Sequence, residues 1–299
     1  MSRSIIRAIS FAALGAAACS PSRKTSNGST VSVVSAGAAD TIGVVLAAGD
    51  IAMCTHGAEE TAELLDGLPG EIIVVGDAAY LSREDPNPYR TCYDRSWGRH
   101  KNRTHPVPGN HDRLTLKMYF DYFGAAAGPR PGGYYSFDVG PWHVLALNST
   151  IAMHSRSPQG RWAAADLAAH PRKCTLAYMH HPRFSSGPHI RNQGIVPMWR
   201  LLDSAGVDVV VSGHDHIYER FAPMHENGER DDARGVRQFV AGTGGAHRYE
   251  IEMVVPNSEA RSTRAHGVLK LTLYPGHYGW EFVPAAASDF TDAGSGTCH

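Results

Sequence analysis

The sequence predicts an α/β fold in which two β-sheets form a sandwich flanked by helices, in four layers of the order α/β/β/α. Short apolar runs rich in β-branched residues recur along the chain and stop at Gly, Asp, Asn or His, a texture typical of strands buried on both faces. Stretches with helical periodicity separate several of these runs. Strand, helix, strand is the order found in layered α/β proteins.

The buried strands and the helices between them follow this pattern along the chain. The expected strands are Ile42–Ala48, Ile72–Val75, Pro106–Pro108, Thr175–Met179 and Val207–Val211. The expected helices are Ala58–Leu68, Trp162–Ala169 and Met198–Ala205.

Three further segments are expected to be antiparallel additions to the sheets. Tyr134–Asn148 has the pattern of a hairpin that turns at Gly140-Pro141. Gln238–Thr243 and Gly267–Tyr274 also have the composition of strands. Together with the buried strands they complete the predicted two-sheet sandwich.

The N-terminus has the pattern of an export signal over residues 1–18. Arg3 and Arg7 precede an apolar run that ends in small residues before Cys19, and this run is too short for a stable membrane anchor. Ordinary cleavage and lipid modification of Cys19 are both compatible with it, and we expect the latter. Residues 19–40 form a flexible tether of Ser, Gly and Ala, and residues 41–299 form the folded domain. The expected location is the periplasm or the outer membrane as an anchored lipoprotein, with secretion as the alternative.

The charge balance excludes several classes of partner. The 28 Lys and Arg nearly equal the 29 Asp and Glu, and no basic stripe suggests nucleic-acid binding. The chain has neither a phosphate-cradling GxxxxGKS loop nor a GxSxG elbow. We expect no obligate protein partner.

Four cysteines lie outside the signal region, and an even number in an exported protein suggests disulfides. Four cysteines allow three pairings. We expect Cys54–Cys92, which flank neighbouring loops, and Cys174–Cys298, which would pin the C-terminal tail. Buried free thiols are the alternative.

Metal-binding side chains stand where the apolar runs end. Ligands in layered α/β folds gather outside the carboxyl ends of strands, and a lone Asp or His there is usually a turn or core residue. Five such motifs in one chain make coincidence improbable. Their mixture of hard oxygen and imidazole nitrogen suits iron, zinc or manganese. The candidate ligands are Asp50, Asp77, Tyr80, Asn110, His180, His214 and His216.

These motifs resemble the signature of the calcineurin-like metallophosphoesterases over roughly residues 42–283. A Tyr three places after Asp77 and an Ala at position 52 are similar to the purple acid phosphatase branch, in its compact single-domain form. The motifs that carry the resemblance are Gly49-Asp50, Gly76-Asp77, Gly109-Asn110-His111-Asp112, His180 and Gly213-His214-Asp215-His216.

The resemblance implies two ions that share Asp77. Tyr80 would favour Fe(III) at one position, and the other ion would be Fe(II), Zn(II) or Mn(II). The first ion would be held by Asp50, Asp77, Tyr80 and His216, and the second by Asp77, Asn110, His180 and His214. His180 is preferred over His181 as ligand because the family's ligand precedes one residue and then a Pro.

Hydrolysis of phosphate esters by a metal-bound hydroxide is the implied reaction. His111 is expected at the phosphoryl group, with Asp112 as its orienting partner or as a simple turn residue. His189 is expected to act as acid or phosphate binder, with His181 next. Arg95, in the loop Tyr89–Lys101, is expected in a basic wall for the substrate, although a solvated loop is an equal alternative.

Phosphomonoesters are the expected substrates. Phosphodiester or phosphotriester hydrolysis on the same centre is the nearest alternative. A non-catalytic surface protein that retains the fold is a third hypothesis, and the complete ligand set argues against it.

Overall fold

The computed structural model describes residues 42–171, 174–189, 192–251, 253–286 and 288–299, which all belong to one unit of the chain, Ala36–His299. The expected signal segment 1–18 and tether 19–40 lie outside the described residues. None of the described helices is both long enough and apolar enough to cross a membrane.

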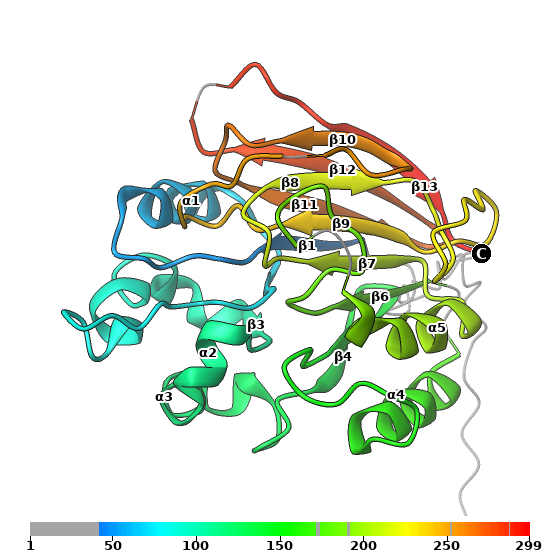
Figure 1. Cartoon of the computed structure of the whole chain (residues 1–299), viewed down its shortest axis with the longest axis horizontal. Coiled ribbons are helices and arrows are strands. Elements are labelled where there is room, and N and C mark those ends of the chain that lie inside the picture. The colour runs from blue at the N-terminus through cyan, green and yellow to red at the C-terminus, as the bar shows by residue number, and fades with distance from the viewer. Residues whose placement is uncertain (1–41, 172–173, 190–191, 252, 287) are drawn as a thin grey trace, which may run out of the picture. The chain divides into compact units, whose positions relative to one another are not determined.

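The first sheet has six strands in the order β13-β12-β11-β1-β2-β3 (Figure 1). β1, β2 and β3 run parallel, whereas β11 pairs antiparallel with β1, with Leu46 opposite Lys270. The strands are β1 Gly43–Ala48, β2 Glu71–Val74, β3 Thr104–Pro106, β11 Gly267–Tyr274, β12 His277–Pro284 and β13 Ala293–Thr297.

The second sheet has seven strands in the order β10-β8-β9-β7-β6-β5-β4. The predicted hairpin is present, with Val139 of β4 opposite Trp142 of β5. The strands are β4 Tyr135–Val139, β5 Trp142–Ala146, β6 Thr175–Tyr178, β7 Val209–Ser212, β8 Tyr218–Phe221, β9 Arg237–Ala241 and β10 Ser258–Ser262.

The prediction that Gln238–Thr243 is a purely antiparallel addition is wrong. This segment forms β9, which lies between β7 and β8, parallel to the former and antiparallel to the latter. The chain leaves β7, reverses into β8 and then returns between them, so β9 repeats the direction of β7.

The two sheets pack against each other with helices outside them, as predicted. Alternate residues of β1 divide between layers, because successive side chains of a strand point to opposite faces. Val45 and Ala47 lie in the core between the sheets, whereas Leu46 and Ala48 pack toward the helices. The helices are α1 His56–Gly67, α2 Asn110–Leu114, α3 Leu116–Phe123, α4 Pro158–Ala169 and α5 Val196–Ser204.

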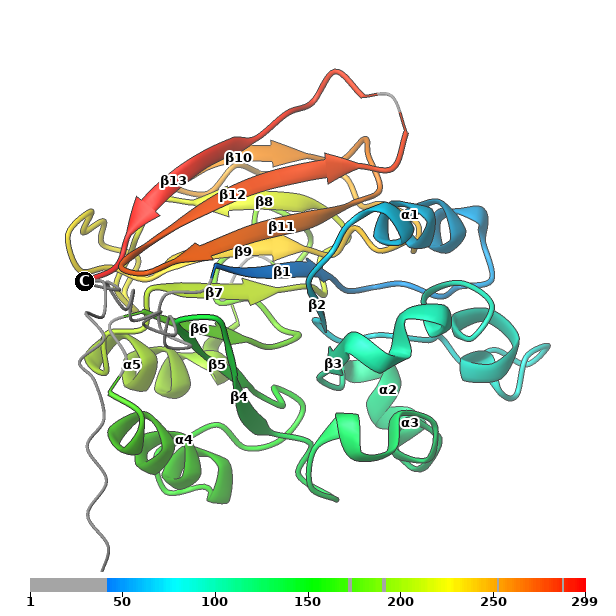
Figure 2. The same cartoon turned by 180° about the vertical axis from the view of Figure 1, so that it is seen from behind.

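The helices divide between the two outer layers. α1 and α3 share one core with the first sheet, and α4 and α5 share another with the second. Figures 1 and 2 show α1 to α3 grouped apart from α4 and α5. The three predicted helices are present as α1, α4 and α5, and their bounds differ from the expected ones by at most four residues.

The segment expected to be the loop Tyr89–Lys101 is mostly helical. It contains one π-turn at Tyr89–Tyr93 and one 3₁₀ turn at Trp97–Arg103. The Trp97 indole is fully buried and donates to Thr61 Oγ1 in α1 at 2.8 Å. This segment therefore covers α1 rather than standing free as a loop.

Candidate metal centre

The centre begins with tight turns at the ends of β1, β2 and β7. Asp50, Asp77 and His214 adopt positive φ values of 58°, 48° and 71°. This left-handed conformation is uncommon in residues other than glycine and is concentrated at functional sites. The strained turns point the three side chains toward one another across the two sheets.

Hydrogen bonds from the backbone fix both carboxylates. Asp50 Oδ2 accepts from the His214 amide at 2.8 Å, so the end of β1 is joined to the end of β7. Asp77 Oδ1 accepts from the His111 amide at the start of α2, also at 2.8 Å. Both carboxylates are almost completely buried. Each keeps its other oxygen for the cluster of imidazoles.

One group of donors gathers around Asp50. The Tyr80 hydroxyl lies 3.1 Å from Asp50 Oδ1 and 3.2 Å from His216 Nε2. His216 Nε2 lies 3.3 Å from the same Asp50 oxygen. His216 Nδ1 donates to the carbonyl of His247 at 2.6 Å, so the Nε2 of the neutral ring carries a lone pair aimed at the other two ligands.

A second group gathers around His180. Its Nδ1 donates to the Val75 carbonyl at 3.0 Å, which again leaves a lone pair on Nε2. That nitrogen faces Asn110 Oδ1 at 2.9 Å, Asp77 Oδ2 at 3.3 Å and His214 Nδ1 at 3.2 Å. Oxygen and nitrogen lone pairs at such distances repel unless a proton or a cation lies between them.

The pKa shifts of these groups also indicate that a proton or a cation must lie between them. Burial lowers the pKa of His180, but the charge and hydrogen bond of Asp77 outweigh this and raise it to about 9. Burial, followed by the charges of Asp50 and Asp77, raises the pKa of Tyr80 well above its usual value. Without an ion, these shifts hold a proton on His180 and on Tyr80, and a metal ion would supply the same positive charge. The residues fit the implied ions.

The flanking histidines lie beside this cluster. The rings of His181 and His189 lie 4.5 and 4.1 Å from the ring of His214, between centroids. His181 Nδ1 contacts Ser149 Oγ at 2.8 Å, and burial lowers the pKa of His181 to about 3. The His111 ring packs against Tyr80 at 4.5 Å between centroids. The structure thus brings His111, His181 and His189 to the predicted ligands.

Asp112 contacts groups other than the His111 ring, which it was expected to orient. It is fully buried, and one oxygen accepts from the amides of Gly109 and Ala78 while the other accepts from the Tyr89 hydroxyl at 2.6 Å. Among the hydrogen bonds of the described residues, none joins it to the His111 ring. Because Ala78 follows Asp77 directly, Asp112 instead fastens the Asp77 turn to the start of α2.

Arg95 also lies apart from the cluster. It is exposed and lines a cavity of about 560 Å³ beside Cys54, Glu59 and Asp85. None of the predicted ligands is among the described residues that line this cavity. Arg95 therefore agrees with the alternative of a solvated loop and not with that of a basic wall for the substrate.

Two residues at the centre, Tyr249 and Asp215, were not among the site residues predicted from the sequence. The ring of Tyr249 stacks on His216, with centroids 4.1 Å apart and planes at 9°. Asp215 is buried, and its Oδ1 lies 2.6 Å from His189 Nδ1. Tyr249 follows the glycine run 242–245, which packs against the β1 turn through the Gly244 amide and the Gly49 carbonyl. That glycine run was the available signal for this loop.

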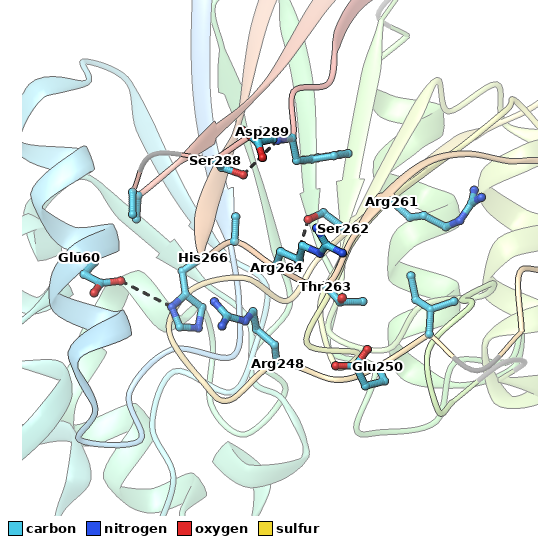
Figure 3. A pocket seen from close by; sticks show the side chains of 15 residues that line it. Glu60, Arg248, Glu250, Arg261, Ser262, Thr263, Arg264, His266, Ser288 and Asp289 are labelled. Atoms are coloured by element: carbon cyan, nitrogen blue, oxygen red, sulfur yellow. Dashed lines mark hydrogen bonds and ion pairs between the residues drawn. The ribbon is translucent and has the colours of Figure 1, made fainter.

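Two further cavities lie near these loops. One of about 590 Å³ includes Asn110 and His181 in its lining and so adjoins the centre. Another of about 650 Å³ is lined by Arg248, Arg264 and His266, which pairs with Glu60 at 3.8 Å (Figure 3). None of the predicted ligands is among the described residues lining the latter. The cavity at Asn110 is therefore the better candidate for substrate.

With this geometry, the family model of the calcineurin-like phosphoesterases matches residues 43–218. The chain belongs to this family. The match extends from β1 to the start of β8, and so includes every predicted ligand of this phosphoesterase domain.

Relatives with known names lie in the branch suggested by the sequence. Purple acid phosphatase 15 of Arabidopsis thaliana is 30% identical over 241 residues, covering 68% of this chain and 45% of that protein. Purple acid phosphatase 21 of the same plant is 35% identical over 160 residues, covering 49% of this chain and 36% of that protein. The resemblance to purple acid phosphatases is thereby confirmed, although this phosphoesterase spans less than half the length of these relatives.

The fold has a solved counterpart. Purple acid phosphatase PPD1 from yellow lupin (Lupinus luteus) superposes with a TM-score of 0.71 at 16% identity, over 87% of this chain and 54% of that one. This similarity confirms the predicted fold class of the phosphoesterase.

The cysteines of this phosphoesterase pair as predicted. Disulfides join Cys54 to Cys92 and Cys174 to Cys298, with Cα atoms 4.9 and 5.4 Å apart. The first closes the loops beside the β1 turn, and the second fastens the chain end near β6.

Proposed function

We propose that the protein hydrolyses phosphomonoesters at a centre of two metal ions. The convergence of metal-binding atoms around Asp50 and His180 carries this proposal, because only a cation or shared protons can hold them so close. The ligands are Asp50, Asp77, Tyr80, Asn110, His180, His214 and His216.

Asp77 would be a ligand of both ions. The first ion would be Fe(III), held also by Asp50, Tyr80 and His216, because ionising the buried phenol beside two carboxylates requires a strongly charged cation. The second ion would be Fe(II), Zn(II) or Mn(II), held also by Asn110, His180 and His214. When bound, such ions polarise a phosphoryl oxygen and lower the pKa of water.

The chain's own residues bind and protonate the substrate. His111, beside ligand Asn110 and packed on Tyr80, donates a hydrogen bond to a phosphoryl oxygen. His189 gives its proton to the leaving oxygen as the ester bond breaks. Its side chain is 46% exposed and its Nδ1 is held by Asp215, so the Nε2 proton can be replaced from solvent. His181, whose ring also lies beside that of His214, donates a further hydrogen bond to the substrate.

The first experiment is metal analysis with a visible spectrum on the purified protein. Two metals per chain, including iron, and a violet absorption band are expected. Asp77→Asn should remove at least one ion and abolish hydrolysis of 4-nitrophenyl phosphate, since it weakens a ligand shared by both ions. Asp121→Asn, a change on the exposed face of α3, is the control and should leave both unchanged.

The outcomes separate the parts of the proposal. A colourless protein with two metals would retain the phosphoesterase and remove iron and Tyr80 from it. Turnover by Asp77→Asn in a clean preparation would refute the centre. Faster hydrolysis of bis(4-nitrophenyl) phosphate than of the monoester would replace monoesterase by diesterase.

Export is part of the proposed function. Two disulfides suit an oxidising compartment, and the segment ending at Cys19 supplies the signal and a lipid attachment site. Mass spectrometry of the mature N-terminus tests this, because a diacylated Cys19 and a chain cleaved after Ala18 differ in mass.

A further inference from the structure

The cavity of about 590 Å³ beside the metal centre contains an arginine that the proposed reaction does not use. Arg113 lines this cavity together with Asn110 and His181. Arg113 follows Asn110 by three residues in α2, so the two side chains leave the same side of the helix with Cβ atoms ~5–6 Å apart. The guanidinium therefore stands beside the place that the substrate's reacting end would occupy.

The guanidinium of Arg113 is unpaired among the described residues. Within the described part of the chain its side chain makes no ion pair or hydrogen bond, and the described lining of the cavity contains no carboxylate. Arg99, by contrast, pairs with both Glu59 and Asp66. A guanidinium offers five donors in a planar fork suited to carboxylate or phosphate.

The rest of the wall is mainly apolar. Ile151 is 39% exposed on the loop that follows β5, and Met153 and Ile195 also line the cavity. Apolar walls with one charged group are typical of pockets that bind an organic molecule and fix its orientation.

We propose that Arg113 determines specificity by binding a second anionic group on the leaving-group side of the substrate. The preferred substrates are then phosphate esters whose organic part also bears a carboxylate or a further phosphate. This inference rests on the proposed function, since it assigns the leaving group to the cavity at Asn110.

The test compares phenyl phosphate with 4-carboxyphenyl phosphate. In Arg113→Ala, kcat/KM should fall about tenfold for the carboxylated ester, equivalent to about 1.4 kcal/mol, and less than about twofold for phenyl phosphate. Arg113→Lys should restore part of the loss, because it keeps the charge without the fork. The control is Arg234→Ala, an exposed arginine in the turn before β9, and it should change neither substrate.

Equal effects on both esters, or none, would overturn the role of Arg113. Calorimetry with phenylphosphonate and 4-carboxyphenylphosphonate separates this outcome from failure of the proposed function, because neither is hydrolysed. Tighter binding of the carboxylated phosphonate, lost in Arg113→Ala, supports the assignment even where no ester is turned over. Equal binding of both phosphonates refutes it.

Discussion

Single glycines allow the ligands to approach one another. A Cβ on Gly213 would lie 2.5 Å from Asp50 Oδ2, and one on Gly76 would lie 2.5 Å from His180 Nδ1. Gly109 has the same relation to the carboxylate of Asp77. At these three positions the glycine before a ligand therefore leaves room for a ligand from another strand.

Gly109→Ala tests this at one atom. Its φ of −98° and ψ of −172° suit alanine, so the new methyl group acts by displacing Asp77, whose Oδ1 and backbone nitrogen both lie too close to it. We expect loss of bound metal and about 100-fold lower kcat, the scale of a misplacement near 1 Å. Metal analysis and turnover measure both. Gly67→Ala, where nothing lies within 4 Å of the added carbon, is the matched control.

At the scale of elements, the sequence predicts the ligands that follow buried strands, but it does not predict the site residues that lie on irregular loops. Asp50, Asp77 and His180 were predictable because each follows a buried strand, and such ends meet at one edge. Tyr249 was not, because its contact with His216 depends on the path of an irregular loop. The role of Asp112 also escaped prediction, since Tyr89, its partner, is 23 residues away.

His225 joins two elements on another side of the second sheet. It pairs with Asp203 in α5 at 3.0 Å and with Asp231 in the β8–β9 turn at 3.2 Å. The hydrogen bond that His225 Nδ1 donates to Asp203 is the main cause that raises the pKa of His225. The stabilisation is therefore complete below its unfolded pKa of about 6.5 and is lost as pH rises through the folded pKa.

His225→Ala should lower the Tm by about 1–3 °C at pH 5.5, because exposed pairs contribute little. The difference should be smaller at pH 9, because the imidazole loses its proton as the pH rises through its folded pKa. Asp203→Asn should give the same dependence. Thermal unfolding at both pH values measures it, and an equal difference at each would contradict the assignment.

At the scale of the whole molecule, the Cys174–Cys298 disulfide closes a loop of 124 residues. It ties the end of the chain to the strand that leads to His180, and the His299 amide adds a hydrogen bond to Asp208 at 2.9 Å. Cross-links that close long loops restrict the unfolded chain most strongly.

Cys174→Ser should therefore lower the free energy of unfolding by roughly 2–5 kcal/mol. Cys298→Ser and the double variant should show the same loss, because each removes one shared bond. Urea unfolding of the three variants measures this. A double variant much less stable than either single one would show that the thiols contribute separately.

The hydrogen bond from the His214 amide to Asp50 is one of several polar contacts that join the two sheets, and another is the bond from the His180 ring to the Val75 carbonyl. Both proposed ions draw ligands from each sheet, so each would bind only while that edge is closed. The affinity for the ions and the free energy needed to separate the two sheets at this edge are then coupled. Removing the ions should therefore weaken the contact between the two sheets at this edge.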